Sequence, residues 1–195
     1  MKKLILDDTN LWNDNRLTDR QTDRQTDRPL TLSEKIEESR EALKLAADMS
    51  REYYDKPLII TYSGGKDSDV MLHLAETTLE PEEFEVLNSH TTVDAPETVY
   101  HIRDVFKRLR NHGIKATIDY HIAENGRPVT MWSLIPERRM PPTRIVRYCC
   151  SVLKEAGTPN RLASVGVRAD ESSKRSGRDI FATRGGHYGK RSFFQ

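Results

Sequence analysis

Residues 58–68 read Leu58-Ile59-Ile60-Thr61-Tyr62-Ser63-Gly64-Gly65-Lys66-Asp67-Ser68. The first five are apolar or β-branched, as in a buried strand, and a helical pattern begins where the stretch ends. The glycines lack the Cβ atoms that would keep a phosphate away from backbone N–H groups, and the start of the following helix carries about half a positive charge. With Lys66 and two serines as further donors, the stretch predicts a phosphate-binding loop.

This loop differs from the P-loop of nucleoside triphosphatases. The P-loop pattern requires a hydroxyl residue directly after the lysine, whereas Asp67 follows Lys66, and no glycine precedes Gly65 at the required distance. Ser-Gly-Gly-Lys-Asp-Ser resembles instead the signature of the PP-loop superfamily, the ATP pyrophosphatases and adenine-nucleotide α-hydrolase-like proteins, in which it grips a pyrophosphate or a sulfate-like group. A glycine-rich turn with incidental polar residues is the alternative.

Composition narrows the class of protein. The 195 residues fit one domain, and Lys plus Arg number 31 against 30 for Asp plus Glu, a formal charge of +1. That balance argues against the global basic field of non-specific nucleic-acid binders, so any positive site must be local. No apolar run approaches the roughly 20 residues that cross a bilayer, and the N-terminus lacks the apolar core of a signal peptide. We therefore expect no membrane partner. Cys149 and Cys150 are adjacent, which is atypical of a disulfide framework and favours a reducing compartment, so the expected location is the cytoplasm.

The chain is expected to contain one folded domain between two tails. Residues 18–29 repeat Thr-Asp-Arg followed by Gln or Pro, without an apolar residue, and predict a disordered tail over 1–30. A phosphate-binding arm made of its arginines is the alternative. The domain is expected over 31–180, and its first helix, about 31–54, starts with a capping box of Thr31 and Glu34. Residues 181–195 follow no periodicity and predict an irregular tail of a domain that looks truncated at its C-terminus.

Strands and helices alternate along the predicted domain. Strands are expected at 58–62, 84–87, 116–121 and 162–167, with a proline-marked region at 131–136 and a short helix at about 150–155. The intervening helices are predicted from apolar spacing, with Val70, Met71, Leu74 and Ala75 in one and Val99, Ile102, Val105, Phe106 and Leu109 in the other. This alternation predicts parallel strands with right-handed connections and a ligand at the carboxyl ends of the strands.

Three further blocks follow the predicted strand exits. Asp94 precedes Pro-Glu-Thr after the second strand, Arg147-Tyr148-Cys149-Cys150 is followed by Lys154, and Gly166 and Arg168 follow the fourth strand. Arg147, Lys154 and Arg168 are candidate anion ligands, and helical spacing would place Lys154 beside Cys150, where an ammonium favours the thiolate. The alternatives are that Asp94 or Thr98 caps a helix, that the cysteines are buried hydrophobes and that Arg168 is solvated.

In their order and spacing, the four blocks resemble the phosphoadenosine phosphosulfate reductase family of the PP-loop superfamily. The resemblance implies an α/β fold, a doubly wound, mainly parallel sheet with helices on both faces, adenine nucleotide alpha hydrolase-like and Rossmann-like. It implies catalytic roles for Lys66, Arg168 and Cys150, and Gly166 would permit the close approach of a nucleotide. The expected nucleotide-binding residues are Ser63, Gly64, Gly65, Lys66, Asp67, Ser68, Asp94, Arg147, Lys154, Gly166 and Arg168.

The same resemblance implies an adenine nucleotide, ATP or phosphoadenosine phosphosulfate, as ligand, with Mg²⁺ left open. Iron–sulfur members of the family join a cysteine pair to a later Cys-x-x-Cys, but Cys149 and Cys150 are the two cysteines of this chain and would be half of such a site. An iron–sulfur cluster is therefore not expected in this chain, and no other metal site is predicted. A cysteine-containing C-terminal segment of the kind that supplies the reductive nucleophile in thioredoxin-dependent members is also missing. The resemblance further implies a thiol reductant protein as a partner.

The function expected from these features is that of a PP-loop enzyme acting on a sulfonucleotide or on ATP in sulfur metabolism. Two alternatives remain open: a nucleotide-binding module without turnover, left by truncation, and an enzyme that uses ATP to transfer sulfur to a nucleic acid. The natural nucleotide and the oligomeric state are left open.

Overall fold

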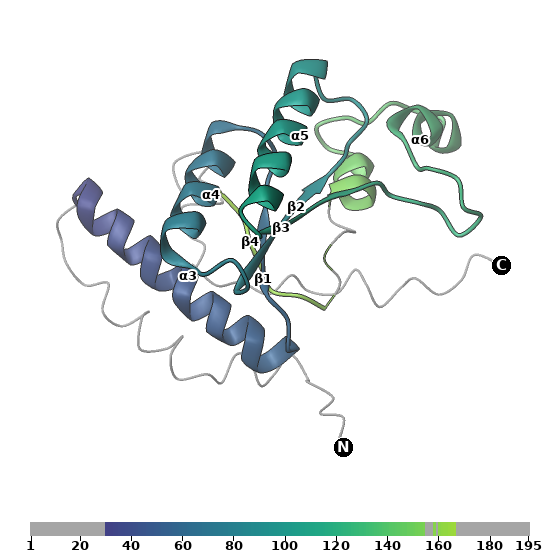
Figure 1. Cartoon of the computed structure of the whole chain (residues 1–195). Helices are drawn as coiled ribbons and strands as arrows, with labels where there is room; N and C mark the ends of the chain where they lie inside the picture. Colours follow the sequence, from purple (N-terminus) through teal and green to yellow (C-terminus); the bar gives the residue numbers. More distant parts are fainter. Residues whose placement is uncertain (1–29, 155–157, 159, 167–195) are drawn as a thin grey trace. The chain divides into compact units, whose positions relative to one another are not determined.

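The computed structural model describes residues 30–154, 158 and 160–166 (Figure 1). The chain divides into two compact units, and one of them, Leu43–Val167, contains the sheet. Of the other unit, the structure describes residues 30–42. Both predicted tails, except Leu30, lie outside the described residues, as does Arg168, so the domain boundaries predicted from the sequence stay predictions.

Four parallel strands form the sheet, in the order β3-β2-β1-β4. Their bounds are β1 (Leu58–Thr61), β2 (Phe84–Ser89), β3 (Lys115–Asp119) and β4 (Ala163–Ser164). Helices flank the sheet, so the α/β class predicted from the alternation is confirmed, and every described strand pair is parallel. β2 and β3 lie on one side of β1 and β4 on the other, which places the reversal of strand order at β1, where open α/β sheets bind ligands.

The helices are α3 (Leu32–Tyr54), α4 (Lys66–Thr78), α5 (Pro96–Asn111) and α6 (Met131–Arg138), and Cys150–Lys154 forms a π-helical turn. α4 connects β1 to β2, and α5 connects β2 to β3. The predicted capping box starts α3, since Thr31 N–H and its hydroxyl both donate to Glu34 Oε2 at 2.8 Å. α3 crosses the boundary between the two units, and its buried residues, from Leu43 to Ser50, belong to the sheet unit.

The buried face of α4 differs from the predicted one. Ser68, Leu72 and Ala75 are its buried residues, and Leu79 directly after the helix is buried too. Val70, predicted to be buried, is 61% exposed. The spacing of four, three and four residues from Ser68 to Leu79 is the proper helical period, but the inward face starts with a serine, which a search for apolar residues passes over.

α6 was not predicted from the sequence. Thr130 caps it, because its side chain accepts a hydrogen bond from Ser133 N–H at 3.1 Å, while Ser133 Oγ accepts one from Thr130 N–H at 3.0 Å. Pro136 lies inside this helix, two residues before its end, and Arg139 directly after the helix has a φ of 56°. Met131 and Leu134 of α6 pack with Leu153 of the π-helical turn, so the two segments share a small apolar cluster of their own.

A charged cluster ties the strands together at their amino ends. Glu85 of β2 is 8% exposed, and its carboxylate forms ion pairs with Arg161 Nη2 at 2.6 Å and Lys115 Nζ at 2.7 Å. Arg161 Nη2 also donates to Pro57 O at 2.7 Å. Residues next to or within all four strands therefore meet at this edge. Burial alone would raise the pKa of Glu85, but the hydrogen bonds from Lys115 and Arg161 outweigh it and hold the pKa below its ordinary value.

Candidate functional site

The chain leaves β1 at a point where side chains complete the sheet hydrogen bonding. Tyr62 N–H donates to Leu87 O at 2.8 Å, and Asn88 Nδ2 donates to Tyr62 O at 2.8 Å. On the other side of β1, Thr61 Oγ1 donates to Ser164 O at 2.9 Å. β1 is thus bound to both neighbours as far as Tyr62, and Ser63 is free to turn out of the sheet. The loop of residues 63–68 therefore begins at the reversal of strand order.

Gly64 has to be glycine for two reasons. Its φ is +74°, in the left-handed region that residues with a Cβ rarely adopt. A Cβ at this position would also lie 2.9 Å from Ile102 Cγ1 and 3.1 Å from Thr98 Cγ2. The loop backbone is therefore pressed against α5, and Gly64 permits that contact.

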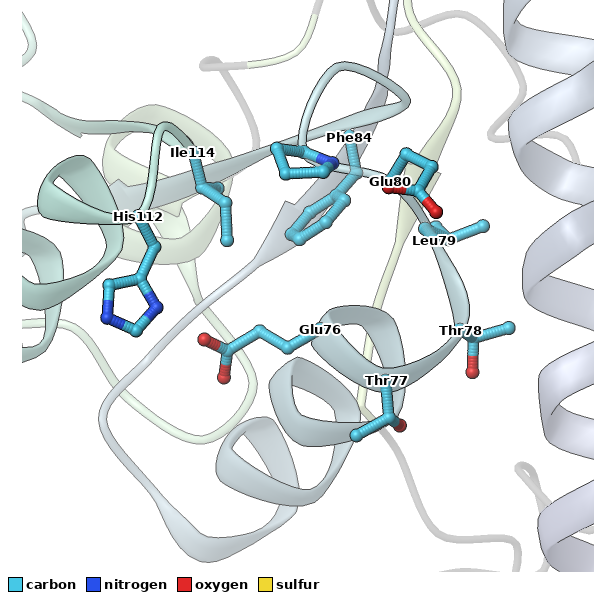
Figure 2. A pocket seen from close by; sticks show the side chains of 9 residues that line it. Glu76, Thr77, Thr78, Leu79, Glu80, Phe84, His112 and Ile114 are labelled. Carbon is cyan, nitrogen blue, oxygen red and sulfur yellow. The ribbon is translucent and has the colours of Figure 1, made fainter.

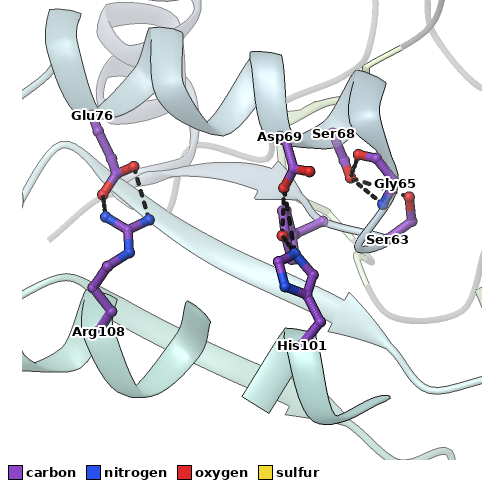
Figure 3. A network of polar contacts seen from close by, with 8 residues as sticks. Ser63, Gly65, Ser68, Asp69, Glu76, His101 and Arg108 are labelled. Carbon is purple, nitrogen blue, oxygen red and sulfur yellow. Dashed lines mark hydrogen bonds and ion pairs between the residues drawn. The ribbon is translucent and has the colours of Figure 1, made fainter. Parts of the chain in front are cut away.

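Hydroxyl groups hold the rest of the loop (Figure 3). Gly65 N–H donates to Ser68 Oγ at 3.1 Å, and Ser68 Oγ donates to Gly65 O at 2.7 Å. Ser63 Oγ donates to Ser68 Oγ at 3.2 Å. The sequence predicts a Gly65 amide that faces a ligand, but in this conformation that amide is used within the loop.

The candidate anion donors are therefore those at the start of α4. Asp69 N–H donates to Gly65 O at 3.0 Å, which places the N–H groups of Lys66 and Ser68 in the first helical turn, where a helix offers no carbonyl acceptor. Lys66 is exposed at the first position of α4, and Ser63 is exposed beside it. A cation, a hydroxyl and a helix N-terminus together suit a phosphate or sulfate group, so the residues present fit the anionic part of a nucleotide.

Gly166 approaches the loop itself. A Cβ on Gly166 would lie 2.7 Å from Asp67 O, closer than real Cβ atoms come to a backbone oxygen. The sequence interpretation placed a nucleotide next to Gly166, and the structure places the backbone of Asp67 there. Gly166 therefore contributes to the site by letting the exit of β4 support the loop.

Side-chain hydrogen bonds fix the segment that follows β2. Thr91 Oγ1 donates to Asp94 Oδ2 at 2.5 Å, and the N-cap of α5 is Ala95, with no side-chain capping bond. The alternative that Asp94 or Thr98 caps α5 is therefore wrong, although Pro96 does lie in the first turn. Thr92 has a φ of 65°, rare for a β-branched residue, and its Oγ1 accepts a hydrogen bond from Met131 N–H at 2.9 Å. Asp94 stays a candidate at the correct edge of the sheet.

The cysteine pair has an arginine beside it. Arg147 Nη2 donates to Cys150 Sγ at 3.4 Å, and the two cysteine sulfurs are 4.0 Å apart. The sequence assigned Lys154 to this role through α-helical spacing, but the segment is π-helical. The backbone of Lys154 contacts the sheet, since Ser89 Oγ donates to Lys154 O at 3.5 Å. Burial and then the neighbouring Cys150 raise the pKa of Cys149, which keeps that thiol protonated, so Cys150 is the better candidate for chemistry.

A four-iron cluster does not fit the residues present. Such a cluster takes four thiolates, and the sequence supplies Cys149 and Cys150. Within residues 30–154, 158 and 160–166, no three His, Cys, Asp or Glu side chains gather in a way that could hold a metal ion.

A cavity of about 340 Å³ lies at the opposite edge of the sheet from the loop (Figure 2). Glu76 and Leu79 at the end of α4, Phe84 at the start of β2 and Ile114 just before β3 contribute to its lining. Ligands of open α/β sheets bind at the carboxyl ends of the strands, so this cavity is a weaker candidate than the loop. None of the described helices combines the length and apolar character that a membrane span needs.

Sequence analysis missed Asn88, Tyr62, Asp69 and His101 as supports of the loop. For Asn88 a signal was present in the sequence, because a polar amide next to a run of buried strand residues needs a hydrogen-bond partner. The partner itself, Tyr62 O, depends on strand register and could not be read from the sequence.

The comparison with known families agrees with this geometry. A family model described as the phosphoadenosine phosphosulfate reductase domain matches residues 57–190, from the residue before β1 onward. A search of curated proteins finds no match to the chain. The match covers more than half of the chain and includes the loop, the strand exits and the cysteine pair. The chain therefore belongs to the phosphoadenosine phosphosulfate reductase domain family, a family of nucleotide-binding enzymes of sulfur metabolism.

Proposed function

We propose that this chain binds an adenine nucleotide, phosphoadenosine phosphosulfate or ATP, at residues 63–68 and acts on its sulfate or phosphate end. The observation that carries the proposal is the loop itself, which leaves β1 at the reversal of strand order and presents the exposed Lys66 at the start of α4. Gly64 lets the loop pack against α5, and Gly166 lets the exit of β4 pack against the loop backbone at Asp67. The family match adds the expectation of a nucleotide.

The proposed chemistry is electrostatic. Cleavage of a sulfate–phosphate or phosphate–phosphate bond leaves negative charge on the departing group, and fixed cations and helix N–H groups stabilise that charge. Lys66 would act at the loop, and Arg147 and Lys154 would act from the cysteine segment; Arg168, which lies outside the described residues, is proposed for the same role. When ATP is the ligand, Mg²⁺ on the phosphates is part of the proposal.

Cys150 is the proposed thiol, because Arg147 can stabilise negative charge on its sulfur. A thiol reductant protein is the proposed partner for sulfonucleotide reduction. We also propose a reducing, cytoplasmic location, since Cys149 and Cys150 are free thiols.

Calorimetry with Lys66→Ala tests the binding site. We expect the wild-type protein to bind ATP or phosphoadenosine phosphosulfate and Lys66→Ala to lose that binding. Lys107→Ala removes an exposed lysine from α5 and is the matched control, with affinity expected at the wild-type value. Equal nucleotide affinity for Lys66→Ala and the wild-type protein would reject the loop as the site.

Turnover assays then identify the reaction. The protein is supplied with ATP, adenosine phosphosulfate or phosphoadenosine phosphosulfate, together with a dithiol reductant. Release of sulfite identifies a sulfonucleotide reductase, and release of pyrophosphate from ATP identifies an ATP pyrophosphatase. Binding without either product favours a nucleotide-binding module.

A second candidate function is ATP-dependent sulfur transfer to a nucleic acid, favoured by the charge of one segment. Between Gly126 and Lys154 the basic residues are Arg127, Arg138, Arg139, Arg144, Arg147 and Lys154, whereas Glu137 is the acidic one. All these basic residues are exposed, as is Trp132 at 72%. Exposed cations with an aromatic side chain suit a polyanion.

Binding of tRNA and of DNA at increasing salt tests this candidate. A nucleic-acid substrate predicts an affinity that falls steeply with salt, and a slope that becomes shallower in the Arg139→Ala/Arg144→Ala variant. Absence of retention at low salt would rule this candidate out and leave nucleotide binding unaffected.

A further inference from the structure

Three side chains meet directly beneath the loop. The Tyr62 hydroxyl lies 2.5 Å from Asp69 Oδ1 and 3.0 Å from His101 Nε2. Asp69 and His101 are labelled in Figure 3. Tyr62 is the residue before Ser63, and Asp69 is the residue after Ser68. The hydrogen bond between Tyr62 and Asp69 therefore joins the two ends of residues 63–68. Tyr62, Asp69 and His101 are named the loop bracket below.

The loop bracket is anchored in the core through α5. Tyr62 is 2% exposed, and the centroid of its ring lies 5.8 Å from that of Phe106 and 6.5 Å from that of His101. His101 and Phe106 both belong to α5, the helix against which Gly64 is packed. The loop is thus braced on α5 at Gly64 and at its base.

The chemistry of the three side chains determines which atom donates in each hydrogen bond of the loop bracket. Burial and then the Asp69 carboxylate raise the pKa of Tyr62, so the hydroxyl keeps its proton. An ionised carboxylate can only accept, so Tyr62 O–H donates to Asp69, and the Tyr62 oxygen accepts from His101 Nε2–H. His101 supplies this donor both as the imidazole with its proton on Nε2 and as the imidazolium.

We propose that Tyr62, Asp69 and His101 are positioning residues that hold residues 63–68 in the shape that receives the anion, before the nucleotide binds. The inference rests on the function proposed above. Ordering a residue costs conformational entropy, so a loop that is already ordered binds its ligand with higher affinity. A nucleotide that met an unbraced loop would have to order it.

Ordinary packing between α4 and α5 is the competing explanation, and the structure offers a matched control for it. Arg108 of α5 donates to Glu76 of α4 at 2.7 and 3.2 Å, so this pair also joins the two helices (Figure 3). The pair lies two helical turns from Asp69 along α4, away from the loop. Loss of this pair should loosen the helices but leaves both hydrogen bonds of the loop bracket in place.

The test titrates ATP and phosphoadenosine phosphosulfate into the full-length protein and its variants. Tyr62→Phe keeps the ring among its core neighbours and removes the hydroxyl; we expect affinity to fall about tenfold, the ratio that corresponds to one hydrogen bond of about 1.4 kcal/mol. Arg108→Met should bind as the wild-type protein does. A tenfold loss in Arg108→Met as well would show that helix packing is the cause and would overturn the inference.

A second pair of variants separates the hydrogen bond from the charge. Asp69→Asn and Asp69→Ala both remove the carboxylate charge, but Asn keeps an oxygen acceptor for the Tyr62 hydroxyl. We expect Asp69→Asn to bind about tenfold more tightly than Asp69→Ala. Equal affinities for these two variants would overturn the inference. This comparison also decides the case if circular dichroism shows that Tyr62→Phe is unfolded.

The outcomes separate this inference from the proposed function. If the wild-type protein binds neither nucleotide, the proposed function fails and the loop bracket loses its role with it. If the wild-type protein binds a nucleotide and Tyr62→Phe binds it equally well, the loop bracket alone is rejected.

Discussion

Two glycines show how single residues shape the site. Gly64 and Gly126 have nearly the same φ, +74° and +78°, so both sit in the left-handed region. Their surroundings differ, because a Cβ on Gly64 would meet Ile102 and Thr98, whereas a Cβ on Gly126 would have no neighbour within 4 Å. The backbone cost is common to both positions, and the packing cost belongs to Gly64.

Replacement of each glycine by alanine measures these two costs. Gly126→Ala should lower the free energy of unfolding by about 1 to 2 kcal/mol, the cost of a left-handed alanine. Gly64→Ala should lower it by about 1 to 3 kcal/mol more, because α5 has to move, and should weaken nucleotide binding. Urea unfolding checks the first quantity and calorimetry the second. Equal unfolding free energies for the two variants would contradict the packing against α5.

Glu85 gives a prediction about pH. Its folded-state pKa lies below the ordinary value of 4.5, so its ion pairs stabilise the fold fully above pH 4.5 and lose their effect as pH falls through the folded-state pKa. Glu85→Gln should therefore unfold with about 2 kcal/mol less free energy at pH 7, the contribution of hydrogen bonds to a charged group. The gap to the wild-type protein should shrink as the pH falls below 4.5.

Chemical unfolding of both proteins between pH 7 and pH 3 measures this gap. Glu124→Gln, at an exposed glutamate, is the control and should show no gap at any pH. A gap between Glu85→Gln and the wild-type protein that stayed constant with pH would show that the stabilisation does not come from the charge of Glu85.

At the scale of elements, periodicity and loop chemistry predicted most of the sheet unit. The strands at 58–62, 84–87 and 116–121 were predicted to within two residues at most ends, because buried β-branched runs between turn residues are distinctive. β4 is shorter than predicted, since its pairing with β1 ends at Ser164. There the Thr61 side chain donates a hydrogen bond to Ser164 O in place of a backbone N–H. That bond joins residues far apart in sequence, and nothing local reveals it.

α6 was missed for a different reason. Residues 131–136 were described from the sequence only as a proline-marked region, with no helix predicted there, although the capping residues Thr130 and Ser133 were present in the sequence. Pro136 cannot donate a hydrogen bond to the carbonyl four residues earlier, that of Trp132, but the capping bonds between Thr130 and Ser133 at the start of α6 do not depend on it. Capping residues were thus a better guide than the proline.

The cap of α6 is testable. Thr130→Ala removes the acceptor for Ser133 N–H and should cost about 1 kcal/mol, the usual loss for an N-cap. The loss should appear as faster amide hydrogen exchange in residues 131–134. Thr77→Ala, at an exposed threonine inside α4, should leave the exchange in α6 unchanged. Unaltered exchange in Thr130→Ala would mean that Thr92, through Met131 N–H, holds the helix start by itself.

Within the sheet unit, the two edges of the sheet have different roles. The ion pairs of Glu85 lie at the amino edge, whereas the loop, Gly166 and the polar residues after β2 lie at the carboxyl edge. The position of the site at this edge could be predicted from the sequence, because parallel strands and a glycine loop imply it. Which loop groups face a ligand could not, since that depends on the contacts of Ser68, Gly166 and Tyr62 with distant segments.

Hydrogen exchange with and without nucleotide tests this division. Saturating nucleotide should slow exchange in residues 63–69 and 88–92, at the carboxyl edge, and at a concentration of 100 times Kd it should stabilise the protein by about 2.7 kcal/mol. The amides of Leu79, Glu80, Phe84, His112 and Ile114, which line the cavity of Figure 2, should keep their exchange rates relative to global unfolding. Protection of the cavity residues instead would move the binding site to the amino edge.

The ion-pair cluster of Glu85, Arg161 and Lys115 has a consequence for how this scaffold can change over evolution or in the laboratory. Because the strands are fastened at one end by charges that take no part in the site, residues at the other end can be exchanged without dismantling the sheet. Loops of altered length or polarity grafted after β1 or β2 should still be carried by a folded framework. The substrate range of such a framework is then limited by what its loops recognise, and its capacity to fold is not the constraint.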